Sequence, residues 1–283
     1  MEWVFLNGRF VERGEAAAPA LDRGLLYGYG LFETMRSYGA RVFRLEEHYR
    51  RLVEGAAVLD LPPAFTLDDL RVAIDALLER NGLADAYLRL TVTAGPAPDD
   101  GGASPSILLV ARPLSGYPPA LYRRGTAAVT GSSRRNEASP LSRIKSLNYL
   151  DNLLAREEAR HKGADEAILL NTRGLVAEGG ASNLFLVSGG RLLTPGLDSG
   201  ALPGITRAAV LELAPAAGLP CAECDVEAAT LAGAAEAFLT NSIMGVMPLT
   251  RLDGRPIGSG RPGPVTGAIR RLYARTVARE TAR

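Results

Sequence analysis

The chain has 283 residues, of which 47% are hydrophobic, and its 32 basic and 31 acidic side chains leave a net charge of +1. This length and apolar content suffice for two domains or one large α/β domain, and the scattered charges argue against nucleic acid and membrane surfaces as partners. The opening residues show no basic or apolar leader and no window holds the roughly 18 apolar residues of a membrane span, so we expect a cytoplasmic protein.

The first part of the chain alternates between strand and helix patterns. Residues 3–12 predict two strands joined by Asn7 and Gly8, a pair suited to a type I′ turn. Helical periodicity marks residues 45–61 and 67–82, and Gly82 after Asn81 predicts the end of the second helix. Residues 86–95 and 106–114 then read as two strands that pair with each other.

The periodicity stops where prolines and glycines gather after residue 113. We therefore predict an N-terminal α/β domain over residues 1–113, a linker over 114–121 and a larger C-terminal domain over 122–283. The expected elements of the second domain are, in order, a strand at 126–132, a helix at 142–163, strands at 166–171 and 175–180, a hairpin around Gly189 and Gly190, a helix at 203–218, a strand at 236–241 and a final helix.

Several common kinds of site are excluded by missing residues. The chain lacks the dinucleotide, phosphate-loop, zinc-protease and serine-hydrolase motifs. Its two histidines, His48 and His161, lie in charged helical stretches and are interpreted as solvated, so neither a triad nor a metal site is expected. The cysteines of the CAEC motif, Cys221 and Cys224, lack a second pair of zinc ligands and are interpreted as reduced thiols.

Lysine chemistry remains, because only two of the 32 basic residues are lysines. Lys162 lies four residues after Glu158, which predicts an ion pair along a helix. Lys145 instead lies at the predicted start of a helix, where a cation opposes the dipole, with Arg143 two residues before it. Such surroundings lower the pKa of a Schiff-base lysine, although a salt-bridged lysine would look the same, so both interpretations stay open.

The motifs IKSLN around Lys145, AEGGASNLF around Glu178 and LPGITR from residue 202 follow one another in a specific order. From DRGLLYGYGLFETMR to the final helix, the chain resembles the class IV, fold type IV pyridoxal-phosphate enzymes. The resemblance implies a two-domain α/β (α+β) fold, pyridoxal 5′-phosphate as cofactor and Lys145 as the catalytic lysine that binds it as a Schiff base. A substrate amine would displace Lys145 to form an external aldimine, and the freed lysine would move protons.

The resemblance also implies the contacts of the cofactor. Glu178 would pair with the pyridine nitrogen and keep it protonated, so that the ring can act as an electron sink. The N–H groups that begin the LPGITR helix would bind the phosphate, and the H-x-x-R-L register selects Arg51 rather than Arg50 as the phosphate-binding arginine. The remaining predicted cofactor contacts are Ile205, Thr206, Asn241, Ser242 and Tyr149.

Substrate contacts are expected on other elements. Tyr87 and Arg89 lie two residues apart on a strand and so share one face, where they could bind the carboxylate of a small-molecule amino substrate. Tyr27 and Phe32 match residues that line the substrate pocket, and the resemblance implies a homodimer.

The identity of the substrate depends on conflicting motifs. FETMR and TNSIMGVMPLTRL resemble the 4-amino-4-deoxychorismate lyases, which release 4-aminobenzoate and pyruvate for folate synthesis, and this is the first prediction. NYLDNLLA, VAEGGASNLF and LPGITR resemble the branched-chain aminotransferases, so an aminotransferase acting on a branched-chain or D-amino acid, or a chiral amine, is the alternative. Arg134 and Arg135 would be candidates for a second carboxylate, or else a solvated loop. A binding protein without catalysis is the second alternative.

Overall fold

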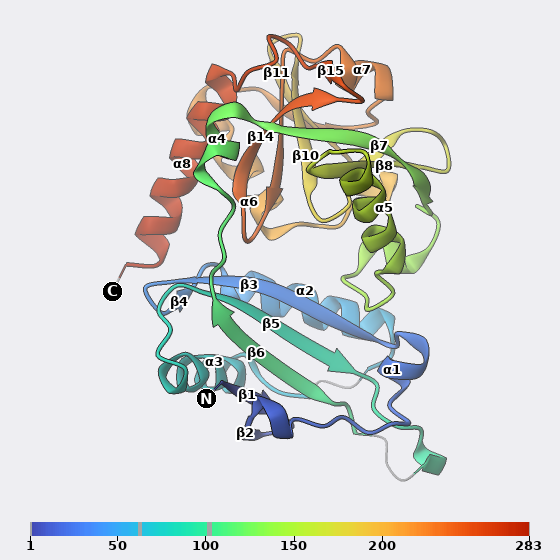
Figure 1. Cartoon of the computed structure of the whole chain (residues 1–283), viewed down its shortest axis with the longest axis vertical. Coiled ribbons are helices and arrows are strands. Elements are labelled where there is room, and N and C mark those ends of the chain that lie inside the picture. The colour runs from blue at the N-terminus through green and yellow to red at the C-terminus, as the bar shows by residue number, and fades with distance from the viewer. Residues whose placement is uncertain (1, 62–63, 101–103, 283) are drawn as a thin grey trace. The chain divides into compact units, whose positions relative to one another are not determined.

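A computed structural model of the protein describes residues 2–61, 64–100 and 104–282. The chain forms two compact units (Figure 1): the first unit comprises Met1–Ser115, Ile144–Asn148 and Val277–Arg283, and the second unit comprises Gly116–Arg143 and Tyr149–Thr276. Both units mix helices with sheets, which confirms the predicted α/β (α+β) class. The domain boundaries remain a prediction, and helix α4 (Pro119–Arg124) begins inside the predicted linker.

The first unit is built on a six-stranded antiparallel sheet in the order β2-β1-β6-β5-β3-β4. Its first hairpin confirms the predicted turn, because Asn7 and Gly8 both have positive φ angles of 49° and 84°. The strands are β1 (Trp3–Leu6), β2 (Arg9–Glu12), β3 (Gly30–Tyr38), β4 (Arg41–Val42), β5 (Ala86–Thr93) and β6 (Ile107–Pro113).

Two amphipathic helices cover this sheet. Helix α2 (Leu45–Val58) packs on β3, and helix α3 (Leu67–Arg80) packs on β1 and β6. Thr66 and Asp69 form a capping box at the start of α3, and Gly82 follows its end with a φ of 62°, as predicted. The short helix α1 (Arg23–Tyr27) precedes β3.

The second unit contains a nine-stranded mixed sheet in the order β12-β11-β10-β13-β14-β7-β8-β9, with β15 on β14. Strand β9 also contacts β10 and β11, so the sheet curls back on itself. Its strands are β7 (Thr126–Arg135), β8 (Glu166–Asn171), β9 (Val176–Gly179), β10 (Asn183–Ser188), β11 (Arg191–Pro195), β12 (Cys221–Cys224), β13 (Glu236–Asn241), β14 (Gly245–Leu252) and β15 (Arg255–Pro256).

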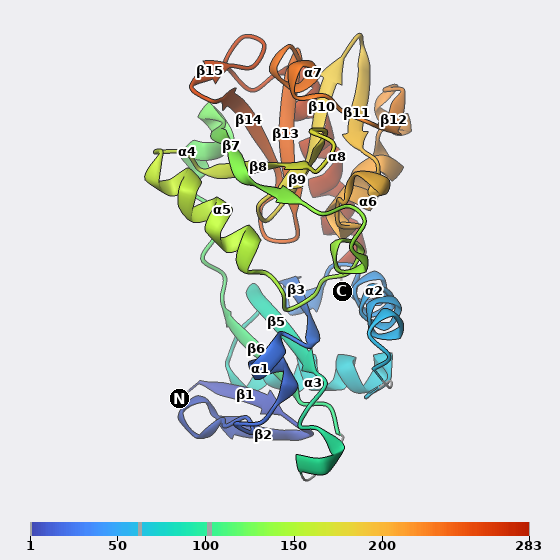
Figure 2. The same ribbon diagram turned by 90° about the vertical axis from the view of Figure 1, so that its right-hand side faces the viewer.

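Helices pack around this curled sheet, and α5 (Leu150–His161) lies against β7 and β8 (Figure 2). Helix α6 (Ile205–Leu213) ends before the predicted Gly218, because Pro215 has no N–H to continue the helix, and a short 3-10 turn follows. The other helices are α7 (Ala228–Ala232) and α8 (Pro264–Glu280), whose last residues, from Val277, belong to the first unit. The 3-10 turns are η1 (Arg13–Glu15) and η2 (Pro98–Asp100) in the first unit and η3 (Pro140–Arg143), η4 (Leu197–Ser199) and η5 (Pro215–Ala217) in the second.

Several local predictions are confirmed. Lys162 binds Glu158 at 2.6 Å, and both cysteines of β12 are free thiols. Gly189 and Gly190 form the turn between β10 and β11 with φ angles of 56° and 72°. Within the described ranges, no helix has the length and apolar character required to cross a lipid bilayer.

Candidate active site

Lys145 lies in the first unit, in a turn that follows the 3-10 turn η3 and precedes a single β-bridge to strand β3. The N–H of Phe32 donates to the carbonyl of Lys145 at 2.9 Å, and Ser146 forms a β-bridge with Leu31. Helix α5 begins only at Leu150, so the predicted position at a helix start is wrong and the helix dipole does not act on this lysine. Sheet-like pairing with β3 fixes the backbone of Lys145 instead.

Two cationic side chains lie close to the aromatic ring of Phe32. The ammonium group of Lys145 lies 4.4 Å from the centroid of the ring, and the guanidinium group of Arg89 lies 4.0 Å from it. Tyr87 occupies the same face of β5 as Arg89, while Leu88 between them is buried on the opposite face. The structure therefore groups Lys145, Phe32 and Arg89, whereas Tyr27 on α1 is 70% exposed.

Arg51 is buried on helix α2 and bound by a carboxylate. Its Nε and Nη2 donate to the two oxygens of Glu33 at 2.8 and 2.6 Å, and Nδ1 of His48 lies 2.6 Å from Glu33 Oε2. Burial alone would raise the pKa of Glu33, but Arg51 together with His48 lowers it to about 2. Glu33 is therefore an anion that fixes the fork of Arg51.

The predicted solvation of His48 is wrong, because the residue is 1% exposed. His48, Arg51 and Leu52 are spaced along the face of α2 that packs on β3, whereas Arg50 is exposed as predicted. Burial lowers the pKa of His48, which favours the neutral ring beside Glu33.

Glu178 lies at the end of β9 in the second unit and is 5% exposed. Its Oε2 accepts from the N–H of Leu202 at 2.9 Å and from the side-chain amide of Asn183 at 3.3 Å. Its Oε1 lies 3.3 Å from Nη2 of Arg135. A guanidinium at this distance stabilises the charged form of the carboxylate.

The guanidinium of Arg135 is consequently engaged by protein groups. Arg135 is not a solvated loop residue, and it does not present a cation to a second substrate carboxylate. Besides Glu178, it donates to the carbonyls of Gly200 and Ser142, each at 3.0 Å. Arg134 donates to the carbonyl of Gly131 in its own strand.

The start of helix α6 offers a binding site for an anion. Thr206 is 2% exposed, and its hydroxyl oxygen has no hydrogen-bond partner in the part of the chain that the structure describes. The first N–H groups of a helix have no partner within the helix, and the N-cap residue here, Gly204, has no side chain that could cap them. A Cβ at Gly204 would collide with the side-chain oxygen of Asn183, so the backbone needs glycine here. Ile205 is also buried.

Tyr149 and Asn241 both donate to one tight turn, residues 179–182, which follows Glu178. The Tyr149 hydroxyl donates to the carbonyl of Gly180 at 2.9 Å, and the Asn241 amide donates to the carbonyl of Ala181 at 2.9 Å. The oxygen of the same Asn241 side chain accepts the N–H groups of Ile243 and Met244, which shapes the turn that contains Ser242.

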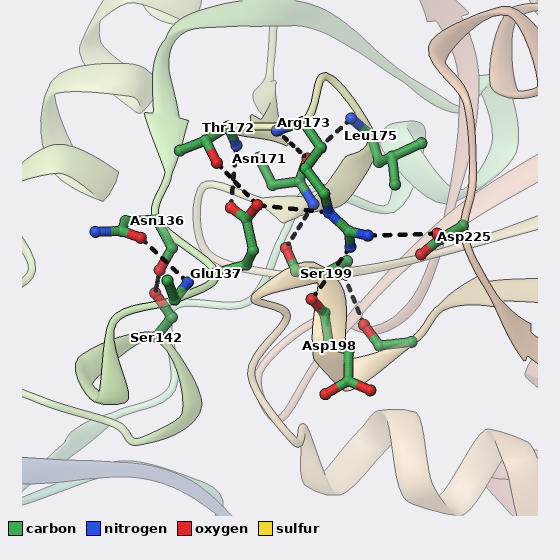
Figure 3. Close-up of polar contacts among 12 residues, drawn as sticks. Asn136, Glu137, Ser142, Asn171, Thr172, Arg173, Leu175, Asp198, Ser199 and Asp225 are labelled. Carbon is green, nitrogen blue, oxygen red and sulfur yellow. Dashed lines mark hydrogen bonds and ion pairs between the residues drawn. The ribbon is translucent and has the colours of Figure 1, made fainter.

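The segment that leads to Lys145 in the chain is anchored by polar contacts in the second unit (Figure 3). Glu137 accepts the N–H and the hydroxyl of Thr172 at 3.1 and 2.8 Å and lies 3.5 Å from Arg173. Arg173 also reaches Asp225 at 3.6 Å and the carbonyl of Asp198 at 3.4 Å. The turn after β8 thus holds the residue 136–143 segment in place.

The family model of class IV amino-transferases matches residues 30–252. The chain belongs to the class IV aminotransferase family. It is 34% identical to D-alanine aminotransferase of Bacillus licheniformis, over 99% of both chains, and 33% identical to aminodeoxychorismate lyase of Bacillus subtilis (strain 168), over 97% of this chain and 94% of that one. The branched-chain amino acid aminotransferase from Thermobaculum terrenum, solved in its pyridoxal-phosphate holo form, has a similar fold, with a TM-score of 0.87, 31% identity and coverage of 99% and 94%.

This class IV enzyme has fold type IV, and its cofactor is pyridoxal 5′-phosphate. The residues present fit that group. The buried hydroxyl of Thr206 and the start of α6 suit a phosphate, and the anionic Glu178 suits a protonated ring nitrogen. The individual roles predicted for these residues remain predictions.

The sequence does not predict the residues that support Arg51 and Glu178 in this class IV enzyme, and it predicts a different task for Arg135. Glu33 binds Arg51 and is itself contacted by His48, while Arg135 and Asn183 bind Glu178. The spacing of His48 and Arg51 on one helix face was the available signal. Nothing in the sequence pattern connects Arg135 with a carboxylate so much later in the chain, because the pair depends on how β7 and β9 are placed in the sheet.

Proposed function

We propose that the protein is an aminotransferase, which moves the amino group of a branched-chain or D-amino acid to a 2-oxo acid. Two of the relatives named above, the D-alanine aminotransferase and the solved branched-chain aminotransferase, support this alternative over the lyase. The cytoplasmic location stays a prediction.

The observation that carries the proposal is the position of Arg89 and Lys145 against one ring. Arg89 lies 4.0 Å and Lys145 lies 4.4 Å from the centroid of Phe32. An α-amino acid has its carboxylate and its amine on the same carbon, so a cation for the carboxylate is needed close to the reactive lysine. Arg89 meets this requirement, and its planar fork suits a carboxylate.

Six of the predicted residues have a defined task in this proposal, and Tyr149 and Asn241 are further cofactor contacts. Pyridoxal phosphate, when bound, supplies a ring that withdraws electrons from the carbon next to the substrate nitrogen. Lys145 holds and moves the proton at that carbon through its Nζ, and Arg89 with Tyr87 orients the carboxylate. Glu178 holds the proton of the ring nitrogen, while Arg51 and Thr206 bind the phosphate.

The lyase remains a second candidate, because the relative from Bacillus subtilis is an aminodeoxychorismate lyase and the segment TNSIMGVMPLTRL resembles that form. Its substrate carries two carboxylates, and the contact with Glu178 engages Arg135, one of the two candidate cations for the second carboxylate. The other candidate, Arg134, donates to the carbonyl of Gly131.

A single set of assays separates the two candidates. The purified holoenzyme is given 4-amino-4-deoxychorismate without any 2-oxo acid, and separately L-leucine or D-alanine with 2-oxoglutarate. We expect glutamate from the second assay and no 4-aminobenzoate from the first. Release of 4-aminobenzoate and pyruvate, with no amino transfer, would replace the aminotransferase proposal by the lyase.

We also propose that the protein forms a homodimer. Helix α1 exposes Leu25 to 71% and Tyr27 to 70%, and helix α5 exposes Leu150 to 65%. Large apolar side chains at this exposure are typical of surfaces that a partner covers. Sedimentation of the wild type and of Leu150→Asp tests this: a dimer that the substitution dissociates supports the proposal, and a wild-type monomer contradicts it.

A further inference from the structure

The turn of residues 179–182 connects several predicted cofactor residues of the second unit. Glu178 precedes it directly in the chain, while Tyr149 and Asn241 donate to its carbonyls at Gly180 and Ala181. The side-chain amide of Asn152 donates to the same carbonyl of Gly180 at 3.0 Å. The direction of these two carbonyls therefore determines where the side chains of Tyr149 and Asn241 are held.

Glu166 at the start of β8 fixes the opposite side of this turn. Its Oε2 accepts the N–H of Ala181 at 3.3 Å and the hydroxyl of Ser182 at 3.0 Å, and its Oε1 accepts the N–H of Ala167 at 3.1 Å. The N–H of Gly180 donates to the carbonyl of Ala167 at 2.9 Å, so strand β8 binds the turn through both backbone and side chain. Glu166 is 6% exposed.

The space around the turn is also closed. A Cβ at Gly179 would collide with the hydroxyl of Ser182, and a Cβ at Gly180 would lie 2.6 Å from Cγ of Arg156 and 3.0 Å from Oε1 of Glu166. The only cation near Glu166 that the described part of the chain records is Arg156, whose Nε lies 3.8 Å away. Because this ion pair is long, the buried carboxylate depends mainly on its hydrogen bonds to the turn and to Ala167 for compensation.

We infer that Glu166 is a positioning residue of the cofactor site, which acts through the residue 179–182 turn on Tyr149 and Asn241. The inference rests on the proposed function, because the cofactor contacts of Tyr149 and Asn241 belong to that proposal. Glu166 does not touch the cofactor in this scheme. Burial raises the pKa of its carboxyl, while Arg156 and the three donors favour the charged form that accepts all of these hydrogen bonds.

The substitution Glu166→Gln tests this with little change in volume. The amide group of glutamine must face the N–H of Ala167 on one side or the N–H of Ala181 on the other, so one backbone donor loses its acceptor. Glu158→Gln is the matched control, because Glu158 also accepts a backbone N–H and a serine hydroxyl, both from Ser132, but has no contact with the turn.

The measured quantity is the dissociation constant of pyridoxal phosphate, obtained by dialysing each holoenzyme to equilibrium against graded cofactor. We expect Glu166→Gln to raise this dissociation constant about tenfold or more, because the residues that contact the cofactor are then held in the wrong positions. Glu158→Gln should change it by less than about twofold. Ser182→Ala removes one contact and keeps the carboxylate, so a smaller increase is expected. This second variant keeps the inference testable if Glu166→Gln does not fold.

A double-mutant cycle with Tyr149→Phe separates positioning from general stability. If Glu166 acts through the carbonyl that Tyr149 contacts, Glu166→Gln must cost less affinity in the Tyr149→Phe background, about threefold in place of tenfold. The same factor in both backgrounds, or unchanged affinity in Glu166→Gln, overturns the inference. A wild type that binds the cofactor but transfers no amino group overturns only the proposed function.

Discussion

Arg135 and Glu178 form an ion pair of 3.3 Å in the second unit, and the same guanidinium binds the carbonyls of Gly200 and Ser142. One side chain thus connects a buried carboxylate with two loops. One of these loops leads to helix α6 and the other leads along the chain to Lys145. The pair has the features of a support for the cofactor site rather than of a surface ion pair, because Glu178 is 5% exposed.

Removing Arg135 is expected to weaken cofactor binding. In Arg135→Ala, Glu178 stays buried without its cation and both loops lose a donor, so we expect the dissociation constant of pyridoxal phosphate to rise at least about tenfold. Arg135→Lys keeps the charge without the planar fork, so its dissociation constant for pyridoxal phosphate should lie between those of the wild type and Arg135→Ala. Arg134→Ala, which removes only a contact to its own strand, should bind as the wild type does. Equal affinities for Arg135→Ala and Arg134→Ala would contradict the assignment.

The buried hydroxyl of Thr206 predicts opposite effects on stability and on binding. It has no partner among the described residues, and an unsatisfied buried hydroxyl costs about 1–3 kcal/mol. Thr206→Val should therefore leave the cofactor-free protein as stable as the wild type or more stable, by about 1 kcal/mol, while binding pyridoxal phosphate more weakly. Urea unfolding with and without cofactor measures both quantities.

Thr126→Val is the matched control for this experiment. The hydroxyl of Thr126 is buried too, but it donates to the carbonyl of Pro248 at 2.8 Å. Its removal should destabilise both forms by about 1 kcal/mol and leave cofactor affinity unchanged. A Thr206→Val protein that is clearly less stable without cofactor would show that its hydroxyl has a structural task instead.

The lowered pKa of Glu33 predicts how the free energy of unfolding depends on pH. Its pKa of about 2 in the folded protein lies below the ordinary value of 4.5, because Arg51 and His48 outweigh the effect of burial. A lowered pKa contributes stability above pH 4.5 and loses that contribution as the pH falls from 4.5 toward 2. The contribution is on the order of 3 kcal/mol.

Glu33→Gln lacks this contribution at every pH and leaves Arg51 buried without its anion. We expect it to be about 3–5 kcal/mol less stable than the wild type at about pH 6, with the difference shrinking toward about pH 3. Urea unfolding followed by circular dichroism measures this, with the exposed Glu46→Gln on the same helix as control. A difference that stays constant over this pH range would mean that Glu33 is not the titrating group.

The parts of the fold that could be predicted depend on neighbours in the chain. Turns at Asn7 and Gly8 and at Gly189 and Gly190 follow from the positive φ angles that such residues tolerate. Helix α3 follows from apolar spacing and the glycine after its end. In each case the residues that decide the structure lie within a few positions of each other.

The errors arise where the deciding contact is distant. Ile144 and Leu147 next to Lys145 have the spacing of an amphipathic helix, but they lie in a turn and a bend on either side of Ser146, where the backbone pairs with β3. His48 lies among charged residues, yet Glu33 on another element binds it in the interior. Pattern rules do not contain these tertiary partners. The motifs single out Arg51 and Glu178 as candidates, whereas the groups that bind their side chains follow only from the structure.

Arg89 decides whether the substrate must carry a carboxylate next to its amine. In Arg89→Met the cation above Phe32 is replaced by an apolar chain, so the KM for an amino acid donor should rise about 10- to 100-fold, as expected for a lost charge-assisted pair. Cofactor affinity should not change. The same substitution should affect 3-methylbutylamine, which is leucine without its carboxylate, by less than about threefold.

The ratio of kcat/KM for leucine to that for 3-methylbutylamine is therefore the decisive measurement, with leucine in whichever hand the wild type accepts. Arg80→Met is the control, because Arg80 also lies over an aromatic ring, that of Phe10 at 4.6 Å, but has no contact with Phe32. Its ratio should equal that of the wild type. If Arg89→Met lowers the rates for the amino acid and the amine by the same factor, Arg89 supports the ring of Phe32 and the lysine beside it, and the carboxylate must be bound by another cation.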